Sequence, residues 1–244
     1  MKNYKIVVEY NGKNYSGWQI QEGKVTIQGE LERAVFEVTG ETTQVVGSGR
    51  TDAGVSAKAQ VANFLINKEM NLNKFALALN AHLPDDIAVR QVEFADEDFS
   101  ARFSSKKKTY NYYFYVSNIR HPLYDNYALQ VKKADVENMK KACKYLIGEH
   151  DYSSFVARNS GKTNFVRTIY EASIEHVEED LYCFSVTGSG VLYNMVRIIM
   201  GTLIMIGEGK KTPEDMQKII NAKNRTIAGK TVGSVGLVLK NVKY

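Results

Sequence analysis

Apolar side chains recur along this chain in periods that predict two successive sets of strands and helices. Residues 5–10 predict a strand that stops at Asn11-Gly12. A helix is expected to follow, because Thr26 is a typical N-cap, the next apolar residues share one face, and Gly40 ends the pattern. The first half then continues with a strand pair, a helix that stops at Pro84 and a strand, at residues 45–46, 59–66, 72–79 and 87–94.

The second half repeats this order. It begins with a strand rich in aromatic residues, and goes on to a helix, a strand pair with an acidic turn, an apolar helix and a final strand, at residues 108–117, 136–146, 170–177, 181–187, 191–206 and 236–244. Residues 118–133 are expected to form a long connection, and Thr212-Pro213 is expected to begin an additional helix. The pattern predicts an α+β fold of two similar halves, residues 1–105 and 106–244, each an antiparallel sheet covered by helices, with a cleft between them.

Composition places the chain among ordinary globular proteins, with 44% apolar and 24% charged residues in 244. The apolar run at 191–206 contains Asn194 and Arg197, which favours a buried helix over a membrane span. Two cysteines and four scattered histidines indicate neither a disulfide framework nor a metal site. Because the N-terminal residues lead directly into a strand without the pattern of a secretory signal, we expect a cytoplasmic protein without metal.

Basic residues are concentrated locally, although the formal net charge is only +5. One cluster contains Arg102, Lys106, Lys107 and Lys108, and aromatic residues are interleaved with it. A second cluster contains Arg158, Lys162 and Arg167. A solvated charged face would explain such clusters equally well. The 15 tyrosines and 10 phenylalanines favour RNA, whose unpaired bases stack on aromatic rings while its phosphates meet Lys and Arg.

The loop at residues 47–57 contains glycines and small residues around Arg50 and Asp52. Such a loop lets a ligand approach the main chain closely. The alternative is a turn whose Asp bonds its own backbone. Because strands are predicted on both sides, Asp52 lies at a strand end, from which its carboxylate could reach a ligand.

Arg197 is the only charged residue between positions 191 and 206. A helix that is apolar nearly all round is buried, and an arginine inside it needs an acceptor, preferably a carboxylate. Asp52 is the acceptor we expect. The alternatives are that Arg197 extends to the helix edge or pairs with a structural acid. The single tryptophan, Trp18, is expected in the core.

Several ordered motifs together resemble the tRNA pseudouridine synthase A family along nearly the whole chain. They are Tyr10-Asn11-Gly12 with Gly17-Trp18-Gln19, Thr26 to Leu31, Gly49-Arg50-Thr51-Asp52-Ala53-Gly54-Val55, Arg102-Phe103 with Lys108-Thr109-Tyr110-Asn111-Tyr112, Leu192 to Arg197, and Gly236-Leu237.

This resemblance implies the pseudouridine synthase fold and an enzyme that isomerises uridine to pseudouridine in the anticodon stem-loop of tRNA. It implies that Asp52 is catalytic, that Tyr110 stacks on the uracil, that Arg197 pairs with Asp52, and that Arg50 helps to extrude the base. The expected contacts with RNA are Arg50, Thr51, Arg102, Lys106 and Lys108. No cofactor is required for an isomerisation, and the family implies a homodimer.

The sequence departs from the family pattern at Asn11, Ser56, Ser100 and the stretch 231–235. These departures leave the reaction in place and bear on the choice of RNA. A synthase with altered RNA specificity is therefore the first alternative. A non-catalytic RNA-binding protein of the same fold is the second, although Asp52 is present. A hydrolase is the third, but a second carboxylate to act as its acid is not apparent in the sequence.

Overall fold

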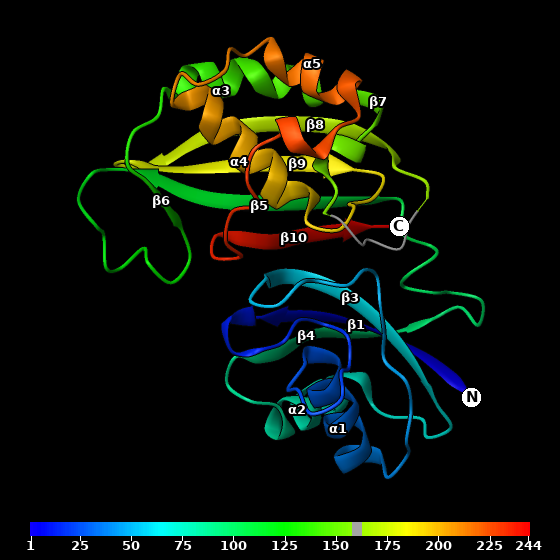
Figure 1. Ribbon diagram of the computed structural model, residues 1–244. Coiled ribbons are helices and arrows are strands. Elements are labelled where there is room, and N and C mark those ends of the chain that lie inside the picture. Colours follow the sequence, from blue (N-terminus) through cyan, green and yellow to red (C-terminus); the bar gives the residue numbers. More distant parts are fainter. Residues whose placement is uncertain (158–162) are drawn as a thin grey trace. The chain divides into compact units, whose positions relative to one another are not determined.

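The computed structural model describes residues 1–157 and 163–244 (Figure 1). The chain forms two compact units, Met1–Lys106 with Val238–Tyr244, and Lys107–Leu237. The C-terminal strand, which the repeated pattern assigned to the second half, therefore belongs to the first unit. Val238 and Leu239 pair with Ser56 and Ala57, and these backbone hydrogen bonds hold the strand there.

The first unit contains a sheet with the strand order β4-β1-β3-β10. Its strands are β1 (Lys2–Tyr10), β2 (Val46–Gly47), β3 (Ser56–Ile66), β4 (Ile87–Ala95) and β10 (Leu237–Lys243). β1 lies antiparallel between β3 and β4, the short β2 pairs with β3, and β10 is parallel to β3. The antiparallel sheet expected from the pattern thus has one short parallel pairing at β10.

The two helices of this unit are α1 (Ile27–Thr39) and α2 (Leu72–His82), and a 3-10 helix, η1 (Gly12–Asn14), follows β1. The Thr26 hydroxyl accepts a hydrogen bond from Gly29 N at 3.3 Å, and Gly40 ends α1 with φ 75°, as the sequence predicts. Phe75 of α2 meets the Tyr4 ring of β1 edge-on, with 5.2 Å between the ring centroids. The apolar stripe of α2 therefore packs on the sheet.

The second unit contains a sheet with the strand order β5-β9-β8-β7, and β6 is parallel to β5. Its strands are β5 (Lys107–Val116), β6 (Leu129–Val131), β7 (Gly148–Asp151), β8 (Val166–Glu178) and β9 (Leu181–Gly188). β5, β8 and β9 were predicted, although β8 begins four residues earlier than expected at 170. β6, inside the expected long connection, and β7 were not predicted.

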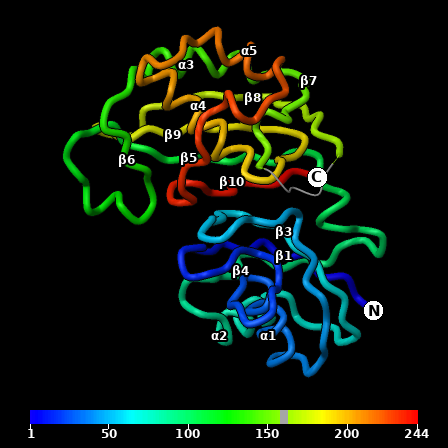
Figure 2. Tube along the Cα trace, in the orientation of Figure 1, coloured from blue at the N-terminus to red at the C-terminus, as the bar shows by residue number. Residues whose placement is uncertain are grey.

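The helices of the second unit are α3 (Val136–Cys143), α4 (Met195–Gly207) and α5 (Asp215–Ala222), with the 3-10 helices η2 (Lys144–Leu146), η3 (Ser153–Phe155) and η4 (Arg225–Ile227). α3 packs on α4 and on β8, and the chain trace of Figure 2 follows these segments through the unit. Among the described residues, every helix is too short or too polar to cross a bilayer.

Two helices begin later than the pattern predicted. α4 begins at Met195 because Asn194, its N-cap, has a left-handed backbone with φ 59°. α5 begins at Asp215, because the Asp215 carboxylate accepts a hydrogen bond from the Thr212 amide at 2.9 Å and closes a turn before the helix. Apolar periodicity reports neither a left-handed backbone residue nor a turn closed by a carboxylate.

Candidate active site

The Asp52 loop connects β2 to β3 within the first unit. Its first residue is fixed to β3, because Ser48 N donates to Val61 O at 2.8 Å. A turn at its far end is closed by Val55 N, which donates to Asp52 O at 3.1 Å, and Gly54 supplies the positive φ of 75° that this turn uses. Arg50 is exposed and Asp52 is half-buried. The loop backbone is therefore held, while Asp52 itself is only half-buried.

The backbone of Tyr15 and Trp18, in the segment between β1 and α1, also holds the Asp52 loop. Trp18 N donates to Thr51 O at 3.0 Å, and Gly54 N donates to Tyr15 O at 3.2 Å. Trp18 is buried, as expected, and its ring packs so closely on Gly47 that a Cβ there would lie 2.6 Å from it. The residue before Asp52 and the second residue after it are thus both tied to one neighbouring segment.

Thr51 faces the interior of the unit. It is 7% exposed, and its hydroxyl lies 2.8 Å from the Tyr10 hydroxyl. Burial raises the pKa of Tyr10 above the ordinary value for a tyrosine, so this phenol stays protonated. The Thr51 side chain therefore supports the loop from within, whereas the resemblance placed it among the contacts with RNA.

Two of the departures from the family pattern stabilise the turn that packs against this loop. The Ser56 hydroxyl accepts a hydrogen bond from Gly12 N at 3.0 Å, and the Asn11 side chain accepts one from Lys13 N at 3.1 Å. Gly12 itself must stay small, because a Cβ would lie 2.1 Å from Val55 O. In this structure Asn11 and Ser56 thus satisfy backbone donors of η1.

Arg102 and Lys106 lie in the segment that follows β4 and are exposed. The Arg102 guanidinium carbon lies 5.3 Å from the centroid of the Phe103 ring, and that ring is 80% exposed. Ser100, another departure, donates its backbone N–H to the Ser104 hydroxyl at 3.2 Å. A cation beside an uncovered aromatic ring is the combination that unpaired bases and phosphates recognise.

Tyr110 and Lys108 lie on β5 of the second unit. Tyr110 pairs with Val186 of β9 and is buried, whereas Lys108 is half-buried. Between them, the hydroxyls of Thr109 and Thr187 lie 2.9 Å apart and join the two strands. The sheet therefore holds the Tyr110 backbone rigidly.

Arg197 lies in the first turn of α4 and is half-buried, so it is less enclosed than the apolar pattern predicted. Its Nε donates to Val232 O at 2.8 Å, and its Nη1 donates to Asn194 Oδ1 at 2.6 Å. These two neutral oxygens, which belong to the same unit, accept part of the hydrogen bonds that the Arg197 guanidinium can donate. The pairing of Arg197 with Asp52 stays a prediction.

Tyr112 is a neighbour of Arg197 that the sequence pattern did not single out. It is fully buried, and its hydroxyl donates to Gly233 O at 2.7 Å. Burial raises the pKa of Tyr112, and the positive charge of Arg197 opposes this rise. Arg197 and Tyr112 thus fix Val232 and Gly233, in the stretch that departs from the family pattern.

The second basic cluster is described only in part, because Arg158 and Lys162 lie outside the described residues. Arg167 is half-buried and its Nη1 donates to Asn164 O at 3.3 Å. Burial lowers the pKa of this guanidinium. In the first cluster, the Lys107 ammonium lies 4.3 Å from the centroid of the Tyr170 ring, a cation–π contact on the surface of the second unit.

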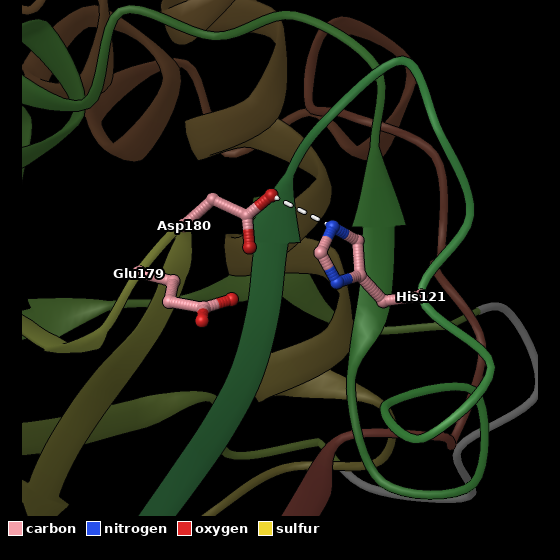
Figure 3. Close-up of side chains that lie close together, drawn as sticks. All are labelled: His121, Glu179 and Asp180. Atoms are coloured by element: carbon pink, nitrogen blue, oxygen red, sulfur yellow. Dashed lines mark ion pairs between the residues drawn. The ribbon is translucent and has the colours of Figure 1, made fainter.

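His121, Glu179 and Asp180 lie together, although the sequence shows only scattered histidines (Figure 3). Each side chain offers one possible ligand atom, and these atoms lie within 4.8 Å of one another. His121 Nε2 lies 3.2 Å from Asp180 Oδ2, and the His121 ring stacks on Tyr124 with 5.2 Å between centroids. These contacts attach the connection after β5 to the turn between β8 and β9.

Comparison with known proteins identifies the family. The sequence model described as "tRNA pseudouridine synthase" matches residues 6–104 and 142–244. Proteins named "tRNA pseudouridine synthase A" are 44% identical in Thermoanaerobacter sp. (strain X514), 45% in Clostridium acetobutylicum and 46% in Clostridium botulinum, each over 245 aligned residues and 100% of both chains. Among solved structures, a chain of the archaeal box H/ACA sRNP Nop10-Cbf5 complex is 10% identical with a TM-score of 0.36, covering 97% of this chain and 45% of that chain.

The family match extends over both units and includes the Asp52 loop, β9, α4 and β10. The relatives named above also align over the complete length of this chain, so the β5 segment between the two matched ranges is covered as well. The chain therefore belongs to the tRNA pseudouridine synthase family.

Proposed function

We propose that this protein isomerises uridine to pseudouridine in tRNA and that the Asp52 carboxylate carries the reaction. The observation that supports this role is the construction of the loop. Trp18 and Tyr15 hold its backbone on both sides of Asp52, while Asp52 itself is only half-buried. A fixed backbone under an accessible acid is what a positioned catalytic group requires.

The reaction breaks the N-glycosidic bond, rotates the uracil and joins its carbon 5 to the ribose. An ionised Asp52 attacks or stabilises the electron-poor ribose or uracil during this exchange. Tyr110 holds the detached uracil by stacking, and Arg197 keeps Asp52 ionised through its positive charge. Because the atoms of substrate and product are the same, the balance of the reaction calls for no cofactor.

Recognition of the RNA rests on exposed cations. Arg50, Arg102 and Lys106 have exposed side chains, and Lys108 is half-buried. We assign phosphate contacts to Arg102, Lys106 and Lys108, which position the RNA without reading its sequence, and we assign to Arg50 the extrusion of the target base. Thr51 acts from inside the unit by holding the residue before Asp52.

We further propose three finer statements, which rest on the resemblance of the motifs. They are that the substrate region is the anticodon stem-loop of tRNA, that the active species is a homodimer, and that the protein works in the cytoplasm. Light scattering of the purified protein at several concentrations measures the oligomeric state. A mass of one chain at every concentration would contradict the dimer.

The function is tested by mapping pseudouridines. Total RNA from cells with and without this protein is modified chemically at pseudouridine and sequenced. Loss of pseudouridines in the anticodon stem-loop of tRNAs is the expected result. Loss only in another RNA would assign the enzyme a different substrate, and an unchanged map would contradict the proposal.

A further inference from the structure

Gln60 is a fully buried amide in the middle of β3, on the same face of the sheet as the apolar residues Ala62 and Phe64. A buried amide is costly unless its donors and acceptor are all paired, so an apolar side chain would suit this core position better. The partners of Gln60 therefore indicate what the amide does.

All the partners of Gln60 lead to the Asp52 loop. Its Oε1 accepts a hydrogen bond from the Ser48 hydroxyl at 2.7 Å, and its Nε2 donates to Gly49 O at 2.9 Å. The amide therefore joins Ser48 and Gly49, the first two residues after β2, to the middle of β3.

We propose that Gln60 is a positioning residue, which sets the orientation of Asp52 by holding Ser48 and Gly49. This inference rests on the proposed role of Asp52. Gln60 is buried and does not touch the RNA, so its effect is on turnover and not on binding. Displacement of the loop by about 1 Å would lower kcat on the order of 10²-fold with KM unchanged.

The test compares Gln60→Met, Gln60→Glu and a control, Ile66→Ala. Methionine keeps the length of glutamine and removes its amide. Ile66 lies on the same strand and the same face, is fully buried and is remote from the loop in the pairing register, so its truncation lowers stability alone. Tritium release from [5-³H]uridine-labelled tRNA gives kcat and KM, and thermal unfolding gives the midpoint temperature.

Gln60→Glu provides a readout that a purely structural role would not change. A protonated carboxylic acid can accept from Ser48 and donate to Gly49 O, as the amide does, whereas a carboxylate cannot donate. The titratable group that faces position 60 is the Tyr10 hydroxyl, whose pKa is raised by burial and which stays protonated in the assay range. Because burial also raises the pKa of a new Glu, its kcat relative to wild type should recover as pH falls.

Trp18 reports the loop independently of activity. It is the only tryptophan in the chain, its backbone bonds Thr51, and its ring packs on Gly47. Gln60→Met should therefore shift the Trp18 emission of the folded protein, and Ile66→Ala should not.

The expected result is a loss of kcat in Gln60→Met, recovery of Gln60→Glu at low pH, and normal kcat in Ile66→Ala. Wild-type kcat in folded Gln60→Met would overturn the inference, as would equal losses in Gln60→Met and Ile66→Ala. Asp52→Ala is assayed beside them. Activity in Asp52→Ala would instead contradict the proposed function, so the two failures are distinguishable.

Discussion

Tyr10→Phe tests whether the support beneath the Asp52 loop is a connected set of hydrogen bonds. The substitution keeps the ring, which packs 6.2 Å from the Trp18 ring between centroids, and so creates almost no cavity. It removes the hydroxyl that bonds Thr51 at 2.8 Å. The change is therefore confined to polar contacts.

The magnitude follows from the burial of the partners. Tyr10 and Thr51 are 3% and 7% exposed, so water cannot easily replace the missing hydroxyl. A net hydrogen bond contributes about 1 kcal/mol, so Tyr10→Phe, which removes one, should lower the free energy of unfolding by about 1 kcal/mol. Thr51→Val removes the same bond and should also cost about 1 kcal/mol.

The double variant separates a network from two independent effects. With both hydroxyls gone, their mutual bond is removed only once, so the double variant should cost about 1 kcal/mol less than the sum of the single costs. Urea unfolding followed by Trp18 fluorescence measures each free energy. Tyr4→Phe is the matched control, because Tyr4 lies on β1 like Tyr10, at the opposite end of the strand. Its hydroxyl donates to Lys68 O and accepts from Met70 N, so the substitution removes bonds that do not involve Thr51. Additivity of Tyr10→Phe with Thr51→Val would refute the connection.

Three further predictions concern the RNA and the second unit. Neutralising the lysines at 106–108 should weaken tRNA binding and reduce the slope of log K against log salt by roughly 0.7–0.9 for each phosphate contact that is lost. Filter binding at several salt concentrations measures this slope, and an unchanged slope would mean that these lysines form only a solvated charged surface. Tyr110→Phe should bind tRNA normally, because stacking needs only the ring, and an inactive variant would assign its hydroxyl to proton transfer. Urea unfolding of Asp52→Ala, Arg197→Met and the double variant should be non-additive if the two charges interact, and additive costs would leave Arg197 with Val232 O and Asn194 Oδ1 as its acceptors.

Elements whose identity depends on local pattern could be predicted from the sequence. The sequence of α1 shows an N-cap threonine, one apolar face and a C-terminal glycine. In the structure the helix is capped by Thr26, ends at Gly40 and buries its apolar face. The short strands β6 and β7 were missed because they are strands only through their partners, β5 and β8. With four residues or fewer, neither shows a period that can be recognised.

In the candidate site, too, features with a local sequence pattern could be predicted, and contacts between distant residues could not. The loop between β2 and β3 could be predicted, because a glycine-rich stretch between two strands is a local signal, whereas the role of Asp52 stays a prediction. The inward orientation of Thr51, the role of Gln60 and the approach of His121 to Asp180 depend on contacts between residues distant in sequence. A single sequence carries no signal for such contacts, since a Thr in a loop and a Gln in a strand are equally compatible with an exposed side chain.

Asp52 is tested most directly by single-turnover tritium release from uracil carbon 5 of tRNA with Asp52→Asn and Asp52→Ala. Both variants should bind tRNA close to normally, because affinity comes from phosphate contacts and stacking, and neither should release tritium above background. Asn keeps the shape of the side chain and removes only the charge, so its inactivity would assign the reaction to the carboxylate. Substantial turnover in Asp52→Ala, with tRNA bound and the protein folded, would contradict the mechanism proposed for this enzyme.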